Sequence, residues 1–168
     1  AVRVVDAGLR LGLDLSGVTF ISGGEASTAA KRAVVAKAGA RLFTNYHISE
    51  VGPIGSACRH RQSGNEVHVV ADSVAVVKRR RPLPFGAGAE VDALLFTTLL
   101  PFAPRFLINA EMDDTGVITR DVRCDCLYGQ LGMTTVISQI ASFGKVTGQG
   151  MTLHGADIAA ILEQALPG

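Results

Sequence analysis

Apolar and polar positions along the first 44 residues follow patterns that predict a strand–helix–strand unit. Residues 2–11 place apolar side chains at a weak helical spacing, which predicts a first helix. Residues 18–21 (VTFI) are short, apolar and rich in strand-forming types, as is typical of a buried strand. A second helix, rich in Ala, Lys and Arg, can be capped by Ser27 or Thr28. Residues 41–44 (RLFT) then form the next strand.

A crossover of this length makes the two strands parallel, so the segments that leave them lie at the same edge of the sheet. These segments are 22–25 (SGGE) and 45–50 (NYHISE), both of which we interpret as loops. Open α/β sheets bind ligands at this carboxyl edge. The two glycines allow close approach of the backbone, and the second segment offers an aromatic ring, a hydroxyl and a carboxylate. The pattern therefore predicts a ligand site here.

After Gly64 the pattern changes to short β-prone runs separated by turn residues. We expect strands at 66–71, 74–77, 93–98, 106–110, 117–119 and 134–140. Such a series predicts a small antiparallel sheet or barrel packed onto the α/β part. Helical spacing returns at residues 158–166. The expected fold class is therefore α/β, with a parallel βαβ portion followed by a small antiparallel β-barrel or sheet.

The composition narrows the classes of function. Of 168 residues, 48% are hydrophobic and 18% are charged, which excludes an intrinsically disordered segment. A net charge of +1 provides no overall field for nucleic acid or an anionic membrane. The basic run at 78–82 (KRRRP) lies between a predicted strand and a Pro-rich turn, so we interpret it as a solvated hairpin end. No apolar run approaches the ~20 residues that span a bilayer. We therefore expect a cytoplasmic chain, without a nucleic-acid or membrane partner.

Several motifs, in one order along the chain, resemble the adenylate-forming superfamily. Residues 21–25 (ISGGE) and 45–52 (NYHISEVG) are similar to two of its nucleotide loops. Residues 88–99 (GAEVDALLFTTL) and the Cys-x-Cys at 124–126 resemble elements of its phenylacetate–CoA ligase branch, and 145–151 (KVTGQGM) stands where that branch's hinge begins. The resemblance implies a part of the family's large domain: an α/β portion at 1–64, a β-rich subdomain at 65–144, and the hinge and start of the lid at 145–168.

The resemblance also implies roles for individual residues. Tyr46 would stack on adenine, Ser49 would hydrogen-bond the α-phosphate, and Glu50 would hold Mg²⁺, with Ser49 and Glu50 as the catalytic pair. Asp114 would accept from the ribose hydroxyls. The remaining cofactor-binding positions would line the adenine and acyl pocket, and they are Gly23, Gly24, Glu25, Asn45 and His47. The alternative for each is ordinary: a core tyrosine, a capping serine, a solvated glutamate and, at 113–116 (DDTG), a plain turn.

The chain departs from the family pattern at three places. His47 replaces a glycine, residues 111–114 (EMDD) lack the R-T-G-D form, and 141–144 (ASFG) contain no arginine. The family's phosphate loop and distal lid lysine have no counterpart among these residues, so we expect the isolated chain to be inactive. The function implied is part of an acid–CoA ligase, which activates a small-molecule carboxylic acid, expected to be an aryl acid, with ATP and transfers the acyl group from acyl-AMP to CoA. The alternative is a non-catalytic, zinc-stabilised binding or scaffolding domain that retains the fold.

Three cysteines are too few for a disulfide framework, but their spacing predicts a metal site. Cys58 and His68 are joined downstream by Cys124 and Cys126, which would share one face if they lay on a strand. Cys₃His is the closed composition of a structural zinc site, and some phenylacetate–CoA ligase relatives resemble this arrangement. His60 is a rival ligand, and three buried free thiols with a surface histidine are the alternative.

Overall fold

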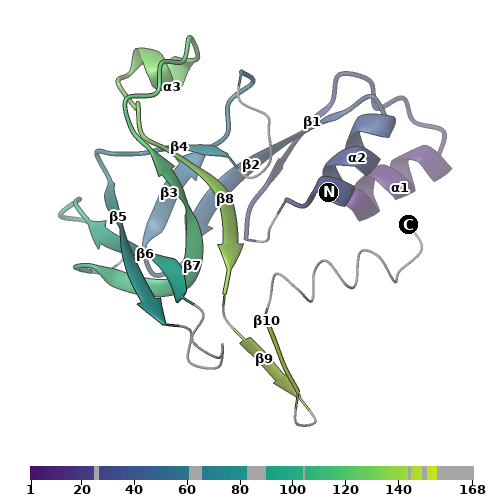
Figure 1. The fold of residues 1–168 in the computed structure, drawn as a ribbon. Coiled ribbons are helices and arrows are strands. Elements are labelled where there is room, and N and C mark those ends of the chain that lie inside the picture. Colours follow the sequence, from purple (N-terminus) through teal and green to yellow (C-terminus); the bar gives the residue numbers. More distant parts are fainter. Residues whose placement is uncertain are drawn as a thin grey trace.

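The computed structural model describes residues 1–24, 27–60, 66–82, 90–103, 105–143, 145–148 and 151–154. Within these ranges the chain is an α/β protein built on one mixed, mostly antiparallel sheet with the strand order β1-β2-β3-β4-β8-β7-β6-β5 (Figure 1). Its strands are β1 (Thr19–Ser22), β2 (Arg41–Ile48), β3 (Gly52–Ser56), β4 (Val67–Val69), β5 (Val74–Pro82), β6 (Glu90–Thr98), β7 (Ala110–Thr119) and β8 (Val136–Ser142).

The predicted strand–helix–strand unit is confirmed. Helices α1 (Val2–Arg10) and α2 (Ala29–Lys37) accompany β1, which pairs with β2 in parallel. The Thr28 side chain caps α2 by accepting from the backbone N–H of Lys31 at 3.3 Å. Just after the helix, Gly39 has a φ of +72°, a left-handed conformation that glycine adopts without a steric penalty. Local sequence signals are therefore sufficient to place this unit.

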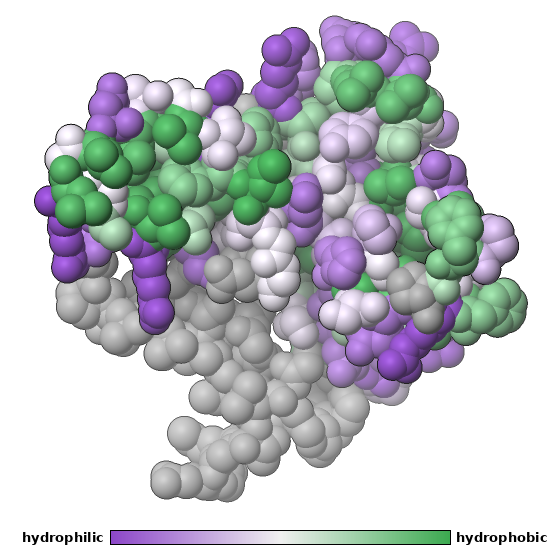
Figure 2. All heavy atoms as spheres, turned by 180° about the vertical axis from the view of Figure 1, so that it is seen from behind, coloured by the Kyte–Doolittle hydropathy of each residue, from purple (hydrophilic) through white to green (hydrophobic). Residues whose placement is uncertain are grey.

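The two helices cover one face of the parallel pair. Val5 of α1 and Val35 of α2 are fully buried and pack with Phe20 and Leu42. On the opposite face, Ile21 is 69% exposed. Figure 2 shows hydrophobic side chains gathered on the side of the molecule where α1 and β1 lie. The exposed large hydrophobic residues of this part of the chain include Val4, Leu9, Leu11, Leu13 and Ile21. The α/β part thus carries apolar surface beside its covered face.

The segment 45–50, predicted as a loop, is mostly strand. β2 continues to Ile48 and pairs antiparallel with β3, with a register shift between Tyr46 and His47. Ser49 and Glu50 lie in the turn that follows. The prediction missed that Tyr46 and Ile48 alternate with polar neighbours, which is a strand pattern. Pairing with β3 therefore overrides the loop interpretation.

The β-rich part is an open sheet, and the barrel alternative is wrong. β1 and β5 are the two edge strands of the described sheet. The same sheet runs across the predicted boundary at residues 64–65, because β3 pairs with β4 and β4 pairs with β8. Strand pairing, which a one-dimensional pattern does not contain, joins the two portions into one continuous layer.

Residues 113–116, for which a plain turn was the alternative interpretation, lie inside β7. The strand expected at 106–110 is absent apart from Ala110. Asp113 adopts a left-handed φ of +57°, and the pairing with β8 shifts register between Thr115 and Val117. Aspartate tolerates this conformation better than most residues. A bulged strand therefore absorbs turn-forming residues without breaking the sheet.

The main core lies under the antiparallel strands. Its fully buried side chains include Phe96 and Leu94 of β6, Ile54 of β3 and Ile137 of β8. The ring of Tyr46 reaches this cluster and meets Phe96 edge-on, with centroids 6.1 Å apart. The core therefore extends to the strand that carries the predicted nucleotide residues.

The basic run predicted at a hairpin end belongs to the edge strand β5. Lys78 pairs with Asp92 at 3.1 Å, and Arg80 pairs with Glu90 at 2.6 Å. The register sets Arg80 opposite Asp92 and Pro82 opposite Glu90, so each ion pair joins diagonal neighbours on one face of the two strands. Asp92 and Glu90 of the neighbouring strand β6 thus neutralise part of the positive charge of the basic run.

Toward the C-terminus, β9 (Lys145–Gly148) and β10 (Met151–His154) form an antiparallel pair. The helix predicted at 158–166 lies outside the described residues. Among the described helices, none is long and apolar enough to cross a membrane.

Candidate metal centre and candidate active-site cavity

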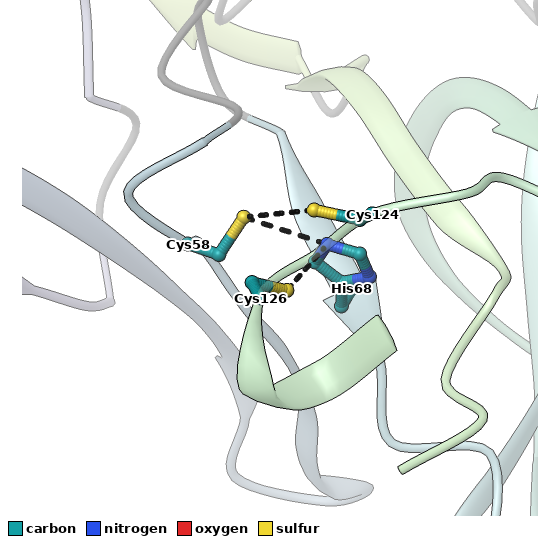
Figure 3. Close-up of side chains that lie close together, drawn as sticks. All are labelled: Cys58, His68, Cys124 and Cys126. Atoms are coloured by element: carbon teal, nitrogen blue, oxygen red, sulfur yellow. Dashed lines mark hydrogen bonds between the residues drawn. The ribbon is translucent and has the colours of Figure 1, made fainter. Parts of the chain in front are cut away.

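The predicted metal ligands converge from three separate segments of the chain (Figure 3). Cys58 follows β3, and His68 is the middle residue of β4. Cys124 and Cys126 lie between β7 and the short helix α3 (Leu127–Gln130). Pairing of β3 with β4 sets Ser56 opposite His68, which brings Cys58 close to the imidazole. The sheet therefore assembles half of the cluster, and the loop before α3 supplies the other half.

The Cys-x-Cys pair does not lie on a strand, contrary to the expectation. Cys126 is the N-cap of α3, and its Sγ accepts from the backbone N–H of Gly129 at 3.4 Å. The turn of α3, rather than strand alternation, aims both thiols toward one point.

The distances match those of a tetrahedral site. All four ligand atoms lie within 4.8 Å of one another. Nε2 of His68 is 3.5 Å from the Sγ atoms of both Cys58 and Cys126, and the Sγ atoms of Cys58 and Cys124 are 3.8 Å apart. Zinc with bonds of about 2.3 Å to sulfur and about 2.0 Å to nitrogen places two sulfurs about 3.8 Å apart and sulfur about 3.5 Å from nitrogen. The group could therefore hold a metal ion such as zinc.

The surroundings of His68 orient its ring. The side chain is 1% exposed, and Nδ1 lies 2.8 Å from the carbonyl oxygen of Met133. Donation from Nδ1–H to this carbonyl leaves the lone pair of Nε2 directed at the sulfurs, which is the usual outer-shell arrangement of a ligating histidine. The ring of Tyr128 stacks on the imidazole, with centroids 5.7 Å apart.

Gly129 is a supporting residue that sequence reasoning missed. A Cβ at this position would collide with the carbonyl oxygen of Cys124, so the turn requires glycine. Burial opposes ionisation of Cys126, but the hydrogen bonds from the Gly129 amide and from the Cys124 and Cys58 thiols lower the pKa of the Cys126 thiol overall. The sequence signal that could have identified this residue is a glycine three positions after the candidate ligand Cys126.

The rival ligand His60 is not part of the cluster. It is exposed, and its Nε2 accepts from Nε of Arg59 at 3.2 Å. An ion bound by all four clustered ligands would have a complete tetrahedral set with no position for water, and Cys58, His68 and Cys126 are buried. Such a closed and buried set is typical of a structural metal site.

A second site is a cavity of about 430 Å³ at the carboxyl end of β2. Its walls include seven residues that the resemblance assigns to the nucleotide: Gly24, Asn45, Tyr46, His47, Ser49, Glu50 and Asp114. Thr44, Ile48 and residues 140–142 of β8 complete the wall. Gly23 lies beside the cavity, where a Cβ would approach the carbonyl oxygen of Asn45 to 3.3 Å. Glu25 lies outside the described residues.

Tyr46 and Asp114 are joined inside this cavity. The phenol donates to Oδ2 of Asp114 at 2.6 Å, although the residues are 68 positions apart. Burial and the carboxylate of Asp114 raise the pKa of Tyr46 far above its ordinary value. Burial also raises the pKa of Asp114, with help from the charge of Asp113 and against the hydrogen bond from Tyr46. This hydrogen bond thus joins β2 to β7 within the cavity wall.

The burial of Asp114 predicts a pH dependence of stability. The pKa of Asp114 is raised above its ordinary value of 3.8, so the folded state retains a proton that the unfolded chain has released. The resulting stability is fully present below pH 3.8 and is lost as pH rises through the folded pKa. Asp114→Asn should flatten the melting temperature over this range, measured by circular dichroism from about pH 3 to about pH 7. Asp72→Asn, in an exposed turn, is the control, and an unchanged slope in Asp114→Asn contradicts the prediction.

Neither the models of known protein families nor the curated proteins searched contain a match to this chain.

Proposed function

We propose that this chain carries the nucleotide-binding part of an ATP-dependent, AMP-forming acid–CoA ligase of the phenylacetate type, stabilised by one structural zinc ion. The observation that carries the proposal is the shared cavity. Residues 46–50 and Asp114 were assigned from separate motifs, and they line the same space at the carboxyl end of a parallel strand. If the resemblance of the two motifs were due to chance, their residues would not be expected to line one cavity.

The cavity supplies groups suited to binding a nucleotide. Ser49 offers a hydroxyl to the α-phosphate, and Asp114 offers carboxylate oxygens to ribose hydroxyls. Part of the Tyr46 ring is engaged with Phe96, so the remaining part would face the base. Glu50 follows β2 in the turn and is exposed, which suits a carboxylate that would hold Mg²⁺. When bound, Mg²⁺ neutralises charge on the phosphate oxygens.

The reaction would proceed in two steps, adenylation of the acid and then transfer of the acyl group to CoA. A substrate carboxylate oxygen attacks the α-phosphorus of ATP and displaces pyrophosphate, giving an acyl-adenylate. The thiol of CoA then attacks the acyl carbon, and AMP leaves. The residues of this chain would contribute to both steps by holding the adenylate in place, because catalysis of this kind depends on positioning and electrostatics.

One observation favours the alternative, a non-catalytic zinc-stabilised binding domain. Among the described residues, no lysine or arginine lines the cavity, whereas Glu50 and Asp114 bring negative charge. Without a metal ion, this wall repels phosphate. Nucleotide binding should therefore depend on Mg²⁺ if the ligase proposal is correct.

Glu50→Gln tests this dependence. In equilibrium dialysis with ATP, the wild-type chain should bind more tightly when Mg²⁺ is present, and Glu50→Gln should weaken that binding by at least about tenfold, since one metal-binding carboxylate is worth several kcal/mol. Asp72→Asn, a carboxylate change in an exposed turn, should bind as the wild type does.

Absence of ATP and AMP binding in the wild-type chain would overturn the ligase proposal in favour of the scaffolding domain. Binding that is equal in Glu50→Gln and wild type, with the same Mg²⁺ dependence, would remove Glu50 from the site. In the parent enzyme, exchange of pyrophosphate into ATP should fall in Glu50→Gln while the folded structure is retained.

A further inference from the structure

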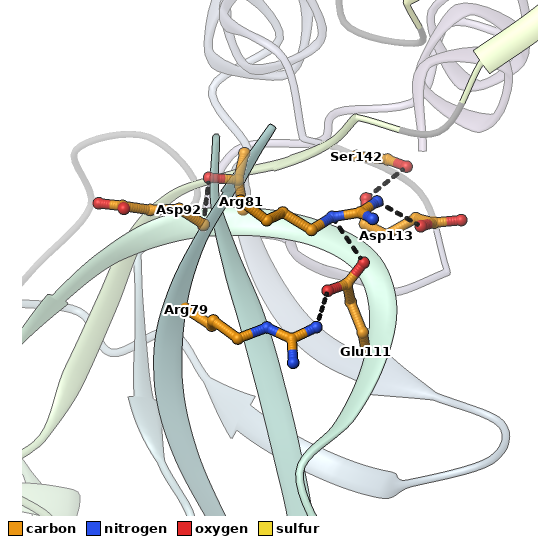
Figure 4. Close-up of polar contacts among 7 residues, drawn as sticks. Arg79, Arg81, Asp92, Glu111, Asp113 and Ser142 are labelled. Atoms are coloured by element: carbon orange, nitrogen blue, oxygen red, sulfur yellow. Dashed lines mark hydrogen bonds and ion pairs between the residues drawn. The ribbon is translucent and has the colours of Figure 1, made fainter. Parts of the chain in front are cut away.

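Arg81 is the least exposed arginine of the basic run on β5. Its side chain is 28% exposed, against 63% for Arg79 and 74% for Arg80. Nε of Arg81 pairs with Oε1 of Glu111 at 2.9 Å (Figure 4). Nη2 lies 4.0 Å from Oδ1 of Asp113, and the guanidinium carbon lies 5.3 Å from the ring centroid of Phe143. One side chain of β5 thus contacts β7 and the segment that follows β8.

Asp113 is the junction between these two segments. Its carbonyl oxygen accepts from the backbone N–H of Phe143 at 2.8 Å and from Oγ of Ser142 at 3.1 Å. Its φ of +57° is a conformation that costs free energy for a residue with a side chain. Such a conformation persists when surrounding contacts enforce it, and Arg81 and the two donors are those contacts.

The groups next to this junction line the cavity. Asp114 follows Asp113 and accepts the hydrogen bond from Tyr46, and Ser142 precedes Phe143. Both Asp114 and Ser142 belong to the cavity wall, whereas Arg81 does not. Displacement of Asp113 or Phe143 would therefore move the neighbouring wall residues.

We propose that Arg81 is a positioning residue for the cavity: by holding Glu111, Asp113 and the ring of Phe143, it fixes Asp114 and Ser142 in the wall. Calling the ligand a nucleotide rests on the proposed function, but the positioning role does not. Arginine suits this task because its planar guanidinium pairs with carboxylates and stacks on an aromatic face at the same time.

Arg79 offers a matched control within the same strand. It pairs with the same glutamate, Glu111, at 3.4 Å. Among the interactions of the described residues, Arg79 makes no ion pair with Asp113 and no ring contact with Phe143. Arg81→Gln and Arg79→Gln therefore remove equal charge and one ion pair with Glu111 each, and they differ in the contacts that Arg81 alone makes with Asp113 and Phe143.

The test uses the whole chain without ligand and reads two local signals. Tyrosine labelled with ¹³C at the ring carbon that bears the hydroxyl reports the Tyr46–Asp114 hydrogen bond, with the signal assigned by Tyr46→Phe. Hydrogen exchange reports the Phe143 amide. Arg81→Gln should shift the Tyr46 signal and speed Phe143 exchange by about tenfold or more, and Arg79→Gln should leave both as in the wild type. Unchanged signals in Arg81→Gln, or equal changes in Arg79→Gln, would overturn the proposal.

Phe143→Leu keeps both ion pairs and removes the aromatic ring, so it serves if Arg81→Gln does not fold. It should shift the Tyr46 signal as well, and an unshifted signal overturns the proposal. A final measurement distinguishes the positioning role of Arg81 from the proposal that the ligand is a nucleotide. AMP affinity should fall about tenfold in Arg81→Gln but not in Arg79→Gln. Local changes in a chain whose wild type does not bind AMP would support the positioning role and refute the nucleotide function.

Discussion

Cys124→Ser is expected to release the metal ion and to lower the free energy of unfolding by about 4 kcal/mol, in the range that loss of a structural metal produces. For a chain of this size, that corresponds to a fall in melting temperature of roughly 10 °C. The ion would link Cys58 to a residue 66 positions away, so it restricts the unfolded chain, and its binding free energy adds to folding. Elemental analysis and calorimetry measure the two effects.

His60→Ala is the matched control for the metal centre. It removes an exposed histidine two residues from Cys58 that is not in the cluster, so metal content and melting temperature should stay at wild-type values. The wild-type chain, purified without chelator, should contain close to one zinc. Negligible zinc in the wild type, or full zinc occupancy in Cys124→Ser, would show the assignment to be wrong.

Phe96→Ala should be comparably damaging for a different reason. The side chain is 0% exposed near the C-terminal end of β6, and its removal leaves a cavity that the surrounding strands fill incompletely. Truncation of a buried phenylalanine costs about 4 kcal/mol. The ring of Tyr46 also loses its edge-on neighbour, so the wall of the candidate nucleotide cavity should loosen.

Phe106→Ala provides the comparison for this core substitution. Phe106 is 84% exposed, and its truncation should change stability by less than about 0.5 kcal/mol. Denaturant unfolding of both variants measures the difference. Equal destabilisation of the two variants would contradict the placement of Phe96 in the core.

The local pattern was most informative where one segment contained its own start and stop signals. The helix after Thr28 is an example, since the capping hydroxyl and Gly39 lie within or beside the element that they bound. Residues 113–116 show the opposite case. Their composition is that of a turn, but pairing of β7 with both neighbours, together with the left-handed Asp113, keeps them in a strand.

At the metal centre too, some features follow from residue chemistry and others from tertiary contacts. Ligand chemistry was readable because three cysteines and a histidine form a complete tetrahedral set. The prediction named His68 and left His60 as a rival ligand, and the pairing of β3 with β4 and the carbonyl of Met133 are what place His68 in the cluster. Tertiary contacts likewise place Arg81, whose partners come later in the chain.

Local sequence signals were sufficient to predict the α/β class, the strand–helix–strand unit, the cysteines and histidine of the metal centre and the polar residues at the end of β2. These features depend on backbone preferences and side-chain chemistry that act over a few residues. Only contacts between distant segments leave the sheet open, bring Asp114 to Tyr46 from 68 positions away and set Arg81 beside Asp113. Contacts between distant segments depend on which strands pair and in which register, and the whole chain sets that register when its apolar faces are buried together.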